Sequence, residues 1–494
     1  MQKGKRRSIA IILLVAILTL GAFVRVANLE NISVYPDELT YHLRAVDAST
    51  GGLLYYDHPP LFISLLSVLQ LSGFESVQSG RIISVIAGVC TVLAVFMLAR
   101  ELYSVKTALV AALFCAVLAF HVLYSRIAQI DALMILLAVS FYALFLRGYN
   151  TGRKYLMALA GVVLGLGIWT KYTLLGIIPV VGLFMFAKEG MKMAKDTKLW
   201  LCAGTTAIVA APLLVLNASA VYWISLGRFA SADATAIHRT IFESLQLFVG
   251  YFSGILLYVQ AIPKTFIEYA FLAIGIVPLA MLVIYFSSTY RKRRTDLLMG
   301  LHFVVFSMFF AVYSVKFEYY LLLSVIPLLP VLAHLMLSQL SKESYFSLGG
   351  AGAIVLLTIL LMNAALSVGN VWNEKGEFEG FRLATAYASS SIRSGTIATS
   401  HTKIIDYYVQ EMHANGIQVI QLNETLYHKE QDMGKNFAQE VDALIIKQNY
   451  YDFFFDDEDK KKIESEFFVR KEFGESLFGA LVFAKGSREG VQGS

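Results

Sequence analysis

Charged residues are scarce in this chain, and their scarcity indicates its class. Asp, Glu, Lys and Arg make up 16% of the 494 residues, and 57% are hydrophobic, whereas soluble proteins carry about 25% charged and roughly 45–50% apolar residues. A soluble globular fold is therefore excluded. Apolar runs of about 20 residues, the length that crosses a bilayer, recur between residues 9 and 371. We expect a membrane domain over residues 1–372 and a soluble domain over residues 373–494.

Cysteines are few as well. The three cysteines, Cys90, Cys115 and Cys202, all lie in apolar runs, so neither a disulfide framework nor a metal site of Cys pairs is expected. The net charge of +5 does not point to nucleic acid, because the basic residues gather in short loops between spans, where membrane insertion places them.

The chain also lacks two features that would change its interpretation. No small-residue cleavage site follows the first apolar run closely, so we expect a retained first span and no removed signal peptide. No internal repeat is visible, which disfavours a transporter built from inverted repeats.

Hydropathy predicts eleven spans, which we place near residues 9–28, 80–99, 106–124, 131–147, 155–170, 173–187, 199–222, 266–288, 297–315, 319–340 and 346–371. The predicted inner segments carry eighteen Lys and Arg residues, and the predicted outer segments carry seven. Because short basic loops stay in the cytoplasm, this bias predicts an inner amino terminus and an outer carboxyl-terminal domain. A twelfth span at 246–262 would move Arg291–Arg294 outside, so we interpret that segment as an interfacial or re-entrant helix.

Two regions outside the spans have a predicted structure of their own. The outer loop at 29–79 is longer than a connection between spans requires, and long loops are often functional. The tail alternates between helical and strand patterns, which predicts a small α/β domain. Its predicted helices are 381–392 and 403–415, and its predicted strands are 396–399, 417–421, 441–446 and 480–484. The segment 452–462 is interpreted as a solvated turn.

Ionisable residues gather at the span ends that the charge rule assigns to the outside. Asp37 and Glu38 lie early in the long loop, and His58 lies further along it, before two prolines. Other candidates at outer span ends are Arg126, Asp131, Lys171, Tyr172, Lys316 and Tyr319. Charged groups beside spans are costly and often functional. Their positions predict a cavity at the outer interface and not an ion path through the bilayer.

Each candidate also has a structural interpretation. The pair Asp37 and Glu38 could be a helix N-cap with a solvated neighbour, and the segment around His58 could form only a turn. Arg126 and Asp131 could pair with each other or anchor at headgroups, and Lys316 could do the latter. The tyrosines fit an interfacial belt. Lys171 is harder to explain structurally, because a glycine-rich approach at 161–167 permits close helix packing and would leave the lysine at a tight turn with little polar company.

In combination these motifs resemble a known family. A first span is followed by Asp-Glu-x-x-Tyr from Asp37 to Tyr41, then by His-Pro-Pro-Leu from His58. Arg81 opens the second span, Asp131 lies in the fourth, and Gly-Leu-Gly-Ile-Trp-Thr-Lys ends at Lys171. This order is similar to the glycosyltransferase family of protein O-mannosyltransferases and the lipid A aminoarabinose transferase (glycosyltransferase family 39 type), and it covers roughly residues 8–340.

The resemblance implies an all-α polytopic membrane domain of GT-C type and an inverting transfer of a sugar from a polyprenyl-phosphate carrier to an acceptor outside the cytoplasm. It gives the first acidic residue of the outer loop, here Asp37, a critical role, and it marks Tyr41 and Arg81 as substrate-binding candidates. The absence of a Trp-Trp-Asp signature argues against an oligosaccharyltransferase.

Physical chemistry suits such a transfer. A lipid-linked phosphate needs an apolar groove that ends in a cationic pocket, and we expect Lys171, Arg126 and Lys316 to hold the phosphate. Asp37 would accept the proton of the acceptor hydroxyl, and Glu38 would orient Asp37 or the acceptor. His58 would bind sugar, phosphate or metal. No obligatory cofactor is expected, although two carboxylates and a histidine leave a divalent metal as an alternative.

Other functions use the same general architecture. A transporter or flippase of a lipid-linked sugar also needs many spans, but its charges usually lie near the midplane. A scaffold with a working outer domain would need only one span. We therefore expect a multi-pass glycosyltransferase of the cell membrane that meets a lipid-linked donor, the bilayer, and a lipid, protein or glycan acceptor, and no nucleic acid.

Overall fold

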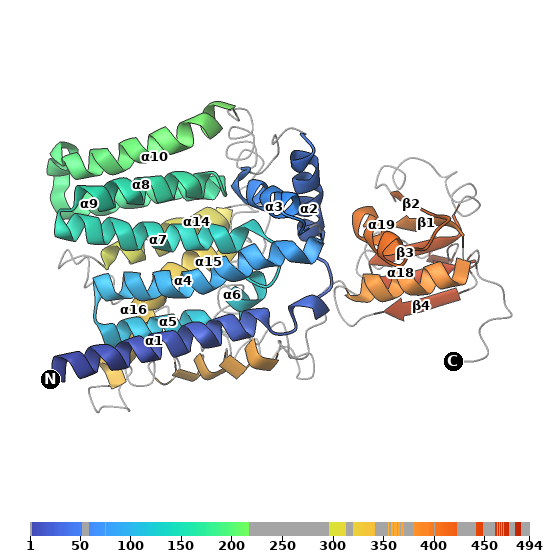
Figure 1. Ribbon diagram of the computed structural model, residues 1–494, viewed down its shortest axis with the longest axis horizontal. Coiled ribbons are helices and arrows are strands. Elements are labelled where there is room, and N and C mark those ends of the chain that lie inside the picture. Colours follow the sequence, from blue (N-terminus) through green and yellow to red (C-terminus); the bar gives the residue numbers. More distant parts are fainter. Residues whose placement is uncertain are drawn as a thin grey trace. The chain divides into compact units, whose positions relative to one another are not determined.

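The computed structural model describes residues 2–51, 59–74, 76–216, 296–312, 320–340, 379–392, 394–399, 401–421, 441–447, 469–473 and 480–485, with scattered positions in 354–369 and 460–467. The chain divides into two compact units, shown in Figure 1. Residues 1–27 and 41–372 form the helical unit, and residues 28–40 and 373–494 form the α/β unit. Helix α2 (Pro36–Ser49) passes from one unit into the other.

Apolar helices make up the helical unit. In chain order they are α1 (Gln2–Val26), α3 (Leu61–Leu71), α4 (Arg81–Leu102), α5 (Val105–Val117), α6 (Ala119–Tyr124), α7 (Ile130–Thr151), α8 (Lys154–Ile168), α9 (Ile177–Glu189), α10 (Thr197–Leu216), α14 (Leu297–Val312), α15 (Tyr320–Val325) and α16 (Leu329–Leu340). Within the described residues, six helical segments are long and apolar enough to cross a membrane. The expectation of a mostly helical, multi-pass membrane domain is confirmed, while the predicted count of eleven spans stays a prediction.

Some of the predicted spans in the described part of the chain are not single α-helices. The run 106–124 breaks at Leu118, whose backbone is extended (φ −66°, ψ 109°), so that α5 ends and α6 begins there. The run 319–340 is divided into α15, a 3-10 turn at Ile326–Leu328, and α16. Hydropathy does not detect the break at Leu118 because this residue is as apolar as its neighbours, whereas Pro327 is a local sequence signal for the turn at Ile326–Leu328. The predicted span 266–288 and the segment 246–262 lie outside the described residues, and 346–371 is described only at scattered positions.

Close packing of α8 against α10 depends on glycine, as the sequence predicts. A Cβ atom on Gly161 would collide with the Cys202 carbonyl oxygen and the Thr205 hydroxyl, and one on Gly165 would lie 2.6 Å from the Val209 side chain. Small residues of this kind let two helix backbones approach each other. The packing also places Trp169 near α10, where its Nε1 donates a 2.7 Å hydrogen bond to the Val209 carbonyl oxygen.

The described parts of the long loop after α1 contain helices. Helix α3 and the part of α2 in the helical unit pack on the start of α7 at one end of the bundle (Figure 1). Their shared core contains Tyr41, Ala45, Phe62, Ile63, Leu66, Ala128 and Ile130. A 3-10 turn at Val77–Gly80 leads into α4, which begins at Arg81 as predicted.

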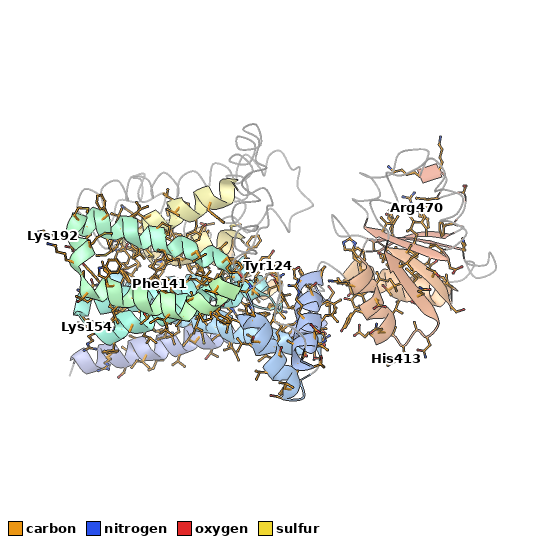
Figure 2. The ribbon with its side chains drawn as sticks, turned by 90° about the horizontal axis from the view of Figure 1, so that it is seen from above. Tyr124, Phe141, Lys154, Lys192, His413 and Arg470 are labelled. Carbon is orange, nitrogen blue, oxygen red and sulfur yellow. The ribbon has the colours of Figure 1, made fainter. Side chains whose placement is uncertain are left out.

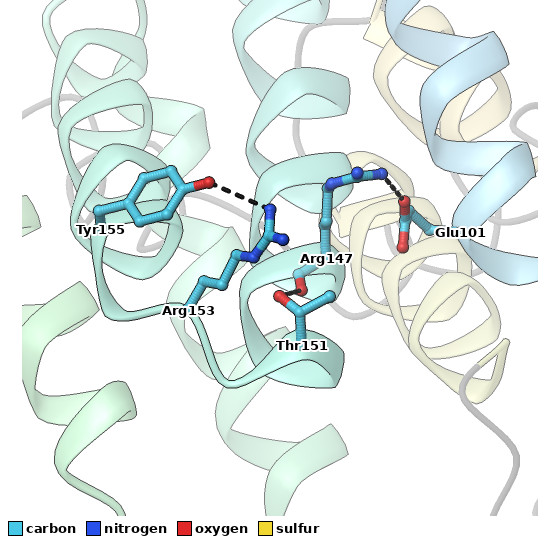
Figure 3. Close-up of polar contacts among 5 residues, drawn as sticks. All are labelled: Glu101, Arg147, Thr151, Arg153 and Tyr155. Carbon is cyan, nitrogen blue, oxygen red and sulfur yellow. Dashed lines mark hydrogen bonds and ion pairs between the residues drawn. The ribbon is translucent and has the colours of Figure 1, made fainter.

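The opposite end of the bundle carries basic side chains. Arg147 Nη1 donates a 2.6 Å hydrogen bond to Glu101 Oε1, and Arg153 Nη1 lies 3.3 Å from Tyr155 Oη, as Figure 3 shows. Lys154 and Lys192 lie at this end, and Tyr124 lies toward the other (Figure 2). The 22 residues of α7 separate the two ends by about 33 Å at 1.5 Å per residue.

The α/β unit contains a five-stranded sheet with the order β2-β1-β3-β5-β4. Its strands are β1 (Gly395–Thr399), β2 (Ile417–Gln421), β3 (Ala443–Lys447), β4 (Val469–Phe473) and β5 (Ala480–Ala484). Strand β1 runs parallel to β2 and β3, whereas β5 runs antiparallel to β3 and β4. Helices α18 (Glu379–Ile392) and α19 (Thr402–Glu411) pack on the sheet and on each other. The predicted α/β fold is thus confirmed, with β4 as a strand that the sequence analysis missed.

Candidate functional site

The first turn of α2 presents the two acidic residues in different ways. Glu38 is fully buried, and its Oε2 accepts a 3.0 Å hydrogen bond from the Tyr35 backbone N–H. This is the arrangement in which a glutamate in the first turn caps the residue before the helix. Asp37 is exposed in the same turn, and Pro36 begins the helix. Negative charge at a helix amino terminus is favoured by the helix dipole. The two neighbours therefore differ: Glu38 faces inward and holds the turn, while Asp37 faces outward.

The chain before α2 belongs to the α/β unit. The backbone N–H of Val34 donates a 3.1 Å hydrogen bond to the Tyr408 hydroxyl oxygen on α19. Tyr408 is only 2% exposed. Burial raises the pKa of Tyr408, with smaller contributions from Glu411 and Glu379, so its hydroxyl stays protonated at neutral pH. Tyr408 is not among the site residues that the sequence predicts.

The later part of α2 lies in the helical unit. The Tyr41 ring packs edge-to-face on Phe62 of α3, with ring centroids 5.7 Å apart. His42 Nδ1 lies 3.2 Å from Gln70 Nε2. Burial lowers the pKa of His42, which favours the neutral ring that can accept this hydrogen bond. Tyr41 is therefore buried, and α2 is held on α3 by apolar and polar contacts.

Lys171 forms an ion pair, contrary to the expectation of little polar company. Its Nζ donates a 2.8 Å hydrogen bond to Asp131 Oδ1 at the start of α7. The side chains are only 14% and 4% exposed. Asp131, for which pairing with Arg126 was one structural alternative, pairs with Lys171 because the turn after α8 reaches the beginning of α7. The Leu61 backbone N–H donates a 3.0 Å hydrogen bond to the Trp169 carbonyl oxygen, so α3 starts beside this turn.

Among the described residues of the helical unit, three arginines are almost wholly buried, namely Arg25, Arg81 and Arg126. Arg126 Nη1 donates to the carbonyl oxygens of Val24 and Ala27, at 2.9 and 2.8 Å. These groups lie at the carboxyl end of α1, where the helix dipole favours cations. Arg81 is the first residue of α4, and the first turn of this helix contacts the residue before α7. There, Ser84 Oγ lies 3.3 Å from both the backbone nitrogen and the carbonyl oxygen of Gln129.

Arg25 is a cation that the sequence analysis missed. Its two Nη atoms donate to three backbone carbonyl oxygens, and Nη2 lies 2.8 Å from His121 Nδ1. All of these partners are neutral acceptors. An arginine in the last turn of an apolar first span was the available signal, but hydropathy cannot distinguish an inward-facing arginine from one that reaches the headgroups.

The remaining predicted site residues divide into two groups. Tyr172 is buried in the 3-10 turn that follows Lys171. His58, Lys316 and Tyr319 lie outside the described residues. Within the part of the chain that the structure describes, no group of three or more His, Cys, Asp and Glu side chains could hold a metal ion.

The geometry of the helical unit suits a ligand with an apolar tail and an anionic head. Buried cations from α1, α4, the α6–α7 turn and the α8–α9 turn gather near the end of the bundle where α3 and α7 begin. Apolar helices surround them, so the charges lie in a medium that screens them weakly.

Comparisons with known proteins agree with this geometry. Residues 57–216 match the family model described as dolichyl-phosphate-mannose-protein mannosyltransferase. The fold is similar to ArnT from Cupriavidus metallidurans bound to undecaprenyl phosphate, with a TM-score of 0.57, 12% identity, and 97% of this chain and 98% of that chain covered. It is also similar to the oligosaccharyltransferase AglB from Archaeoglobus fulgidus in complex with an inhibitory peptide and a dolichol-phosphate, with a TM-score of 0.58 and 15% identity over 90% of this chain and 70% of that one.

These matches confirm the GT-C fold that the sequence motifs imply. They extend the likeness to an oligosaccharyltransferase, whose signature this chain lacks. A comparison with curated proteins finds no relative of significant sequence similarity.

Proposed function

We propose that this chain is a membrane glycosyltransferase of GT-C type, which transfers a sugar from a polyprenyl-phosphate carrier to an acceptor hydroxyl on the outer face of the membrane. The family match over residues 57–216 and the similar fold of ArnT support the proposal. The observation that carries the proposal is the gathering of buried cations among apolar helices at one end of the bundle. Both similar structures were solved with a polyprenyl phosphate, which is the ligand class that such a site would take.

In the proposed reaction one bond forms and one bond breaks. The acceptor oxygen forms a bond to the anomeric carbon while the bond from that carbon to the phosphate oxygen breaks, which inverts the configuration. The electron pair leaves with the polyprenyl phosphate, and the proton goes to the Asp37 carboxylate as general base. Lys171, Arg126 and Arg81 would stabilise the charge that develops on the departing phosphate. Glu38 would act by orienting Asp37, since it caps the turn that carries Asp37.

The base assignment is tested with Asp37→Asn in the purified full-length protein. Radiolabelled polyprenyl-phosphate mannose, glucose and aminoarabinose would be offered together with cell-envelope fractions as acceptors. We expect acceptor-dependent release of polyprenyl phosphate by the wild-type protein and loss of about 100-fold or more in the variant, the usual scale for a general base. Asp47→Asn, an exposed position on the same helix, is the matched control. Unchanged turnover in Asp37→Asn would refute the assignment.

The phosphate role is tested separately from the chemistry. Binding of radiolabelled undecaprenyl phosphate requires no acceptor, so it can be measured on the wild type, Lys171→Ala and a control, Lys192→Ala, at the other end of the bundle. Lys171→Ala should weaken this binding and donor use more than acceptor use. Equal damage to donor and acceptor use, or none, would contradict a phosphate role. Movement of the carrier across the bilayer of reconstituted vesicles, without sugar transfer, would favour the flippase alternative.

A further inference from the structure

The segment that leads to Asp37 is an integral part of the α/β unit. Residues 28–40 group with residues 373–494, although more than 300 residues separate them in the sequence. Four apolar side chains of this segment, Ile32, Val34, Tyr35 and Leu39, are between 2% and 6% exposed. Asp37 is exposed among these buried neighbours. The apolar side chains on either side of the proposed base are thus buried, whereas Asp37 itself is exposed.

Two consecutive backbone N–H groups fix the start of α2. The Val34 N–H donates to the Tyr408 hydroxyl oxygen at 3.1 Å, and the Tyr35 N–H donates to Glu38 Oε2 at 3.0 Å. The second bond lies within the first turn of α2. The first ties that turn to α19, and the acceptor is a ring held rigidly by burial and by an edge-to-face contact with Tyr407, with ring centroids 5.3 Å apart.

We propose that Tyr408 is a positioning residue for sugar transfer, which fixes the entry of the chain into α2 and thereby the direction of the Asp37 carboxylate. The proposal rests on the proposed function of Asp37. A carboxylate in the first turn of a helix moves with that turn, and a displacement of about 1 Å at a reacting group can lower a rate by about 100-fold. The α/β unit therefore contributes to the chemistry through α19.

The test compares Tyr408→Phe with Tyr407→Phe in the full-length protein. Tyr408→Phe keeps the buried ring and removes only the acceptor of the Val34 N–H, whereas Tyr407→Phe removes a hydroxyl from the half-buried neighbour on the same helix. Hydrogen exchange of the peptide containing Val34 should become faster by about fivefold to tenfold in Tyr408→Phe, the scale expected for one net hydrogen bond, and should stay unchanged in Tyr407→Phe.

Kinetics with polyprenyl-phosphate mannose, or with whichever of the three sugars the wild type uses, provide the second measurement. We expect kcat to fall by about tenfold in Tyr408→Phe with unchanged KM values, because the variant affects a group that acts in the transition state. Val34→Pro removes the same hydrogen bond from the donor side and should show the same kinetic pattern. It serves in place of Tyr408→Phe if that variant fails to fold.

The outcomes are distinguishable. Unchanged exchange around Val34 would overturn the contact, and faster exchange with a normal kcat would overturn the positioning role. A rise in KM at constant kcat would also overturn it, because it would assign Tyr408 to binding. Absence of transfer by the wild-type protein with every donor would refute the proposed function, and with it the role of Tyr408, whatever the exchange data show.

Discussion

Breaking the ion pair between Lys171 and Asp131 should destabilise the helical unit strongly. The two charged atoms lie 2.8 Å apart, and the side chains are 14% and 4% exposed. Asp131→Asn removes the carboxylate that the Lys171 ammonium contacts, and Lys171→Met leaves the nearly buried Asp131 carboxylate without that ammonium. Removing one partner of a buried pair costs about 3–5 kcal/mol, because the remaining charge is uncompensated. The double variant removes both charges and should therefore be much less damaged than the sum of the single variants.

The protein contains a matched control for this experiment. Arg147 and Glu101, at the other end of α7, form a pair at 2.6 Å, but their side chains are 45% and 17% exposed (Figure 3). Exposed pairs contribute about 0.2–1 kcal/mol. Free energies of unfolding in detergent micelles would be measured for both double-mutant cycles. A coupling energy of about 2 kcal/mol or more is expected for the buried pair. Additive effects there, or equal couplings in the two cycles, would refute the reasoning.

Two further predictions concern α2. Glu38→Gln keeps an oxygen that can accept the Tyr35 N–H, so turnover should stay within about threefold of wild type. Glu38→Ala should destabilise the turn by about 1 kcal/mol and lower turnover. Equal inactivity of both variants would assign the charge itself to the chemistry. Because burial lowers the pKa of His42 below 6.5, the folded protein binds fewer protons than the unfolded one, and its stability should be full above pH 6.5 and fall as the pH drops through the folded pKa. The melting temperature of His42→Asn should fall less than that of wild type between about pH 7.5 and about pH 5, and an equal fall would contradict the prediction.

Local patterns in the sequence predict much of the fold. Apolar runs indicate the helices because membrane burial requires a continuous apolar surface, and the start of α4 at Arg81 follows from the same signal. Strand β4 escapes detection because its sequence, Val-Arg-Lys-Glu-Phe, has three charged residues, which suit an edge strand exposed to water. The break at Leu118 depends on tertiary packing and leaves no trace in hydropathy.

The residues that belong to the site were easier to predict than the contacts between them. Lys171 and Asp131 both stand out in the sequence, but their contact joins positions 40 residues apart and depends on how α7 and α8 pack. The contact of Val34 with Tyr408 spans 374 residues and joins the loop after α1 to the tail domain. No local periodicity reports such a contact. Short-range capping by Glu38, by contrast, involves residues three apart and is readable from the sequence.

Fixed charges at this end of the bundle support the proposed sugar transfer over the flippase alternative. Asp131 offsets much of the charge of Lys171, whereas the hydrogen bonds of Arg25 all go to neutral acceptors, so Arg25 keeps its charge in apolar surroundings. An uncompensated buried charge is costly, and an incoming phosphate would offset that cost. Arg25 is bound to α1, α5 and α6, three helices that would have to separate before it could follow a phosphate across the bilayer. A cation held in this way suits an enzyme that retains the carrier phosphate at one membrane face while the sugar leaves.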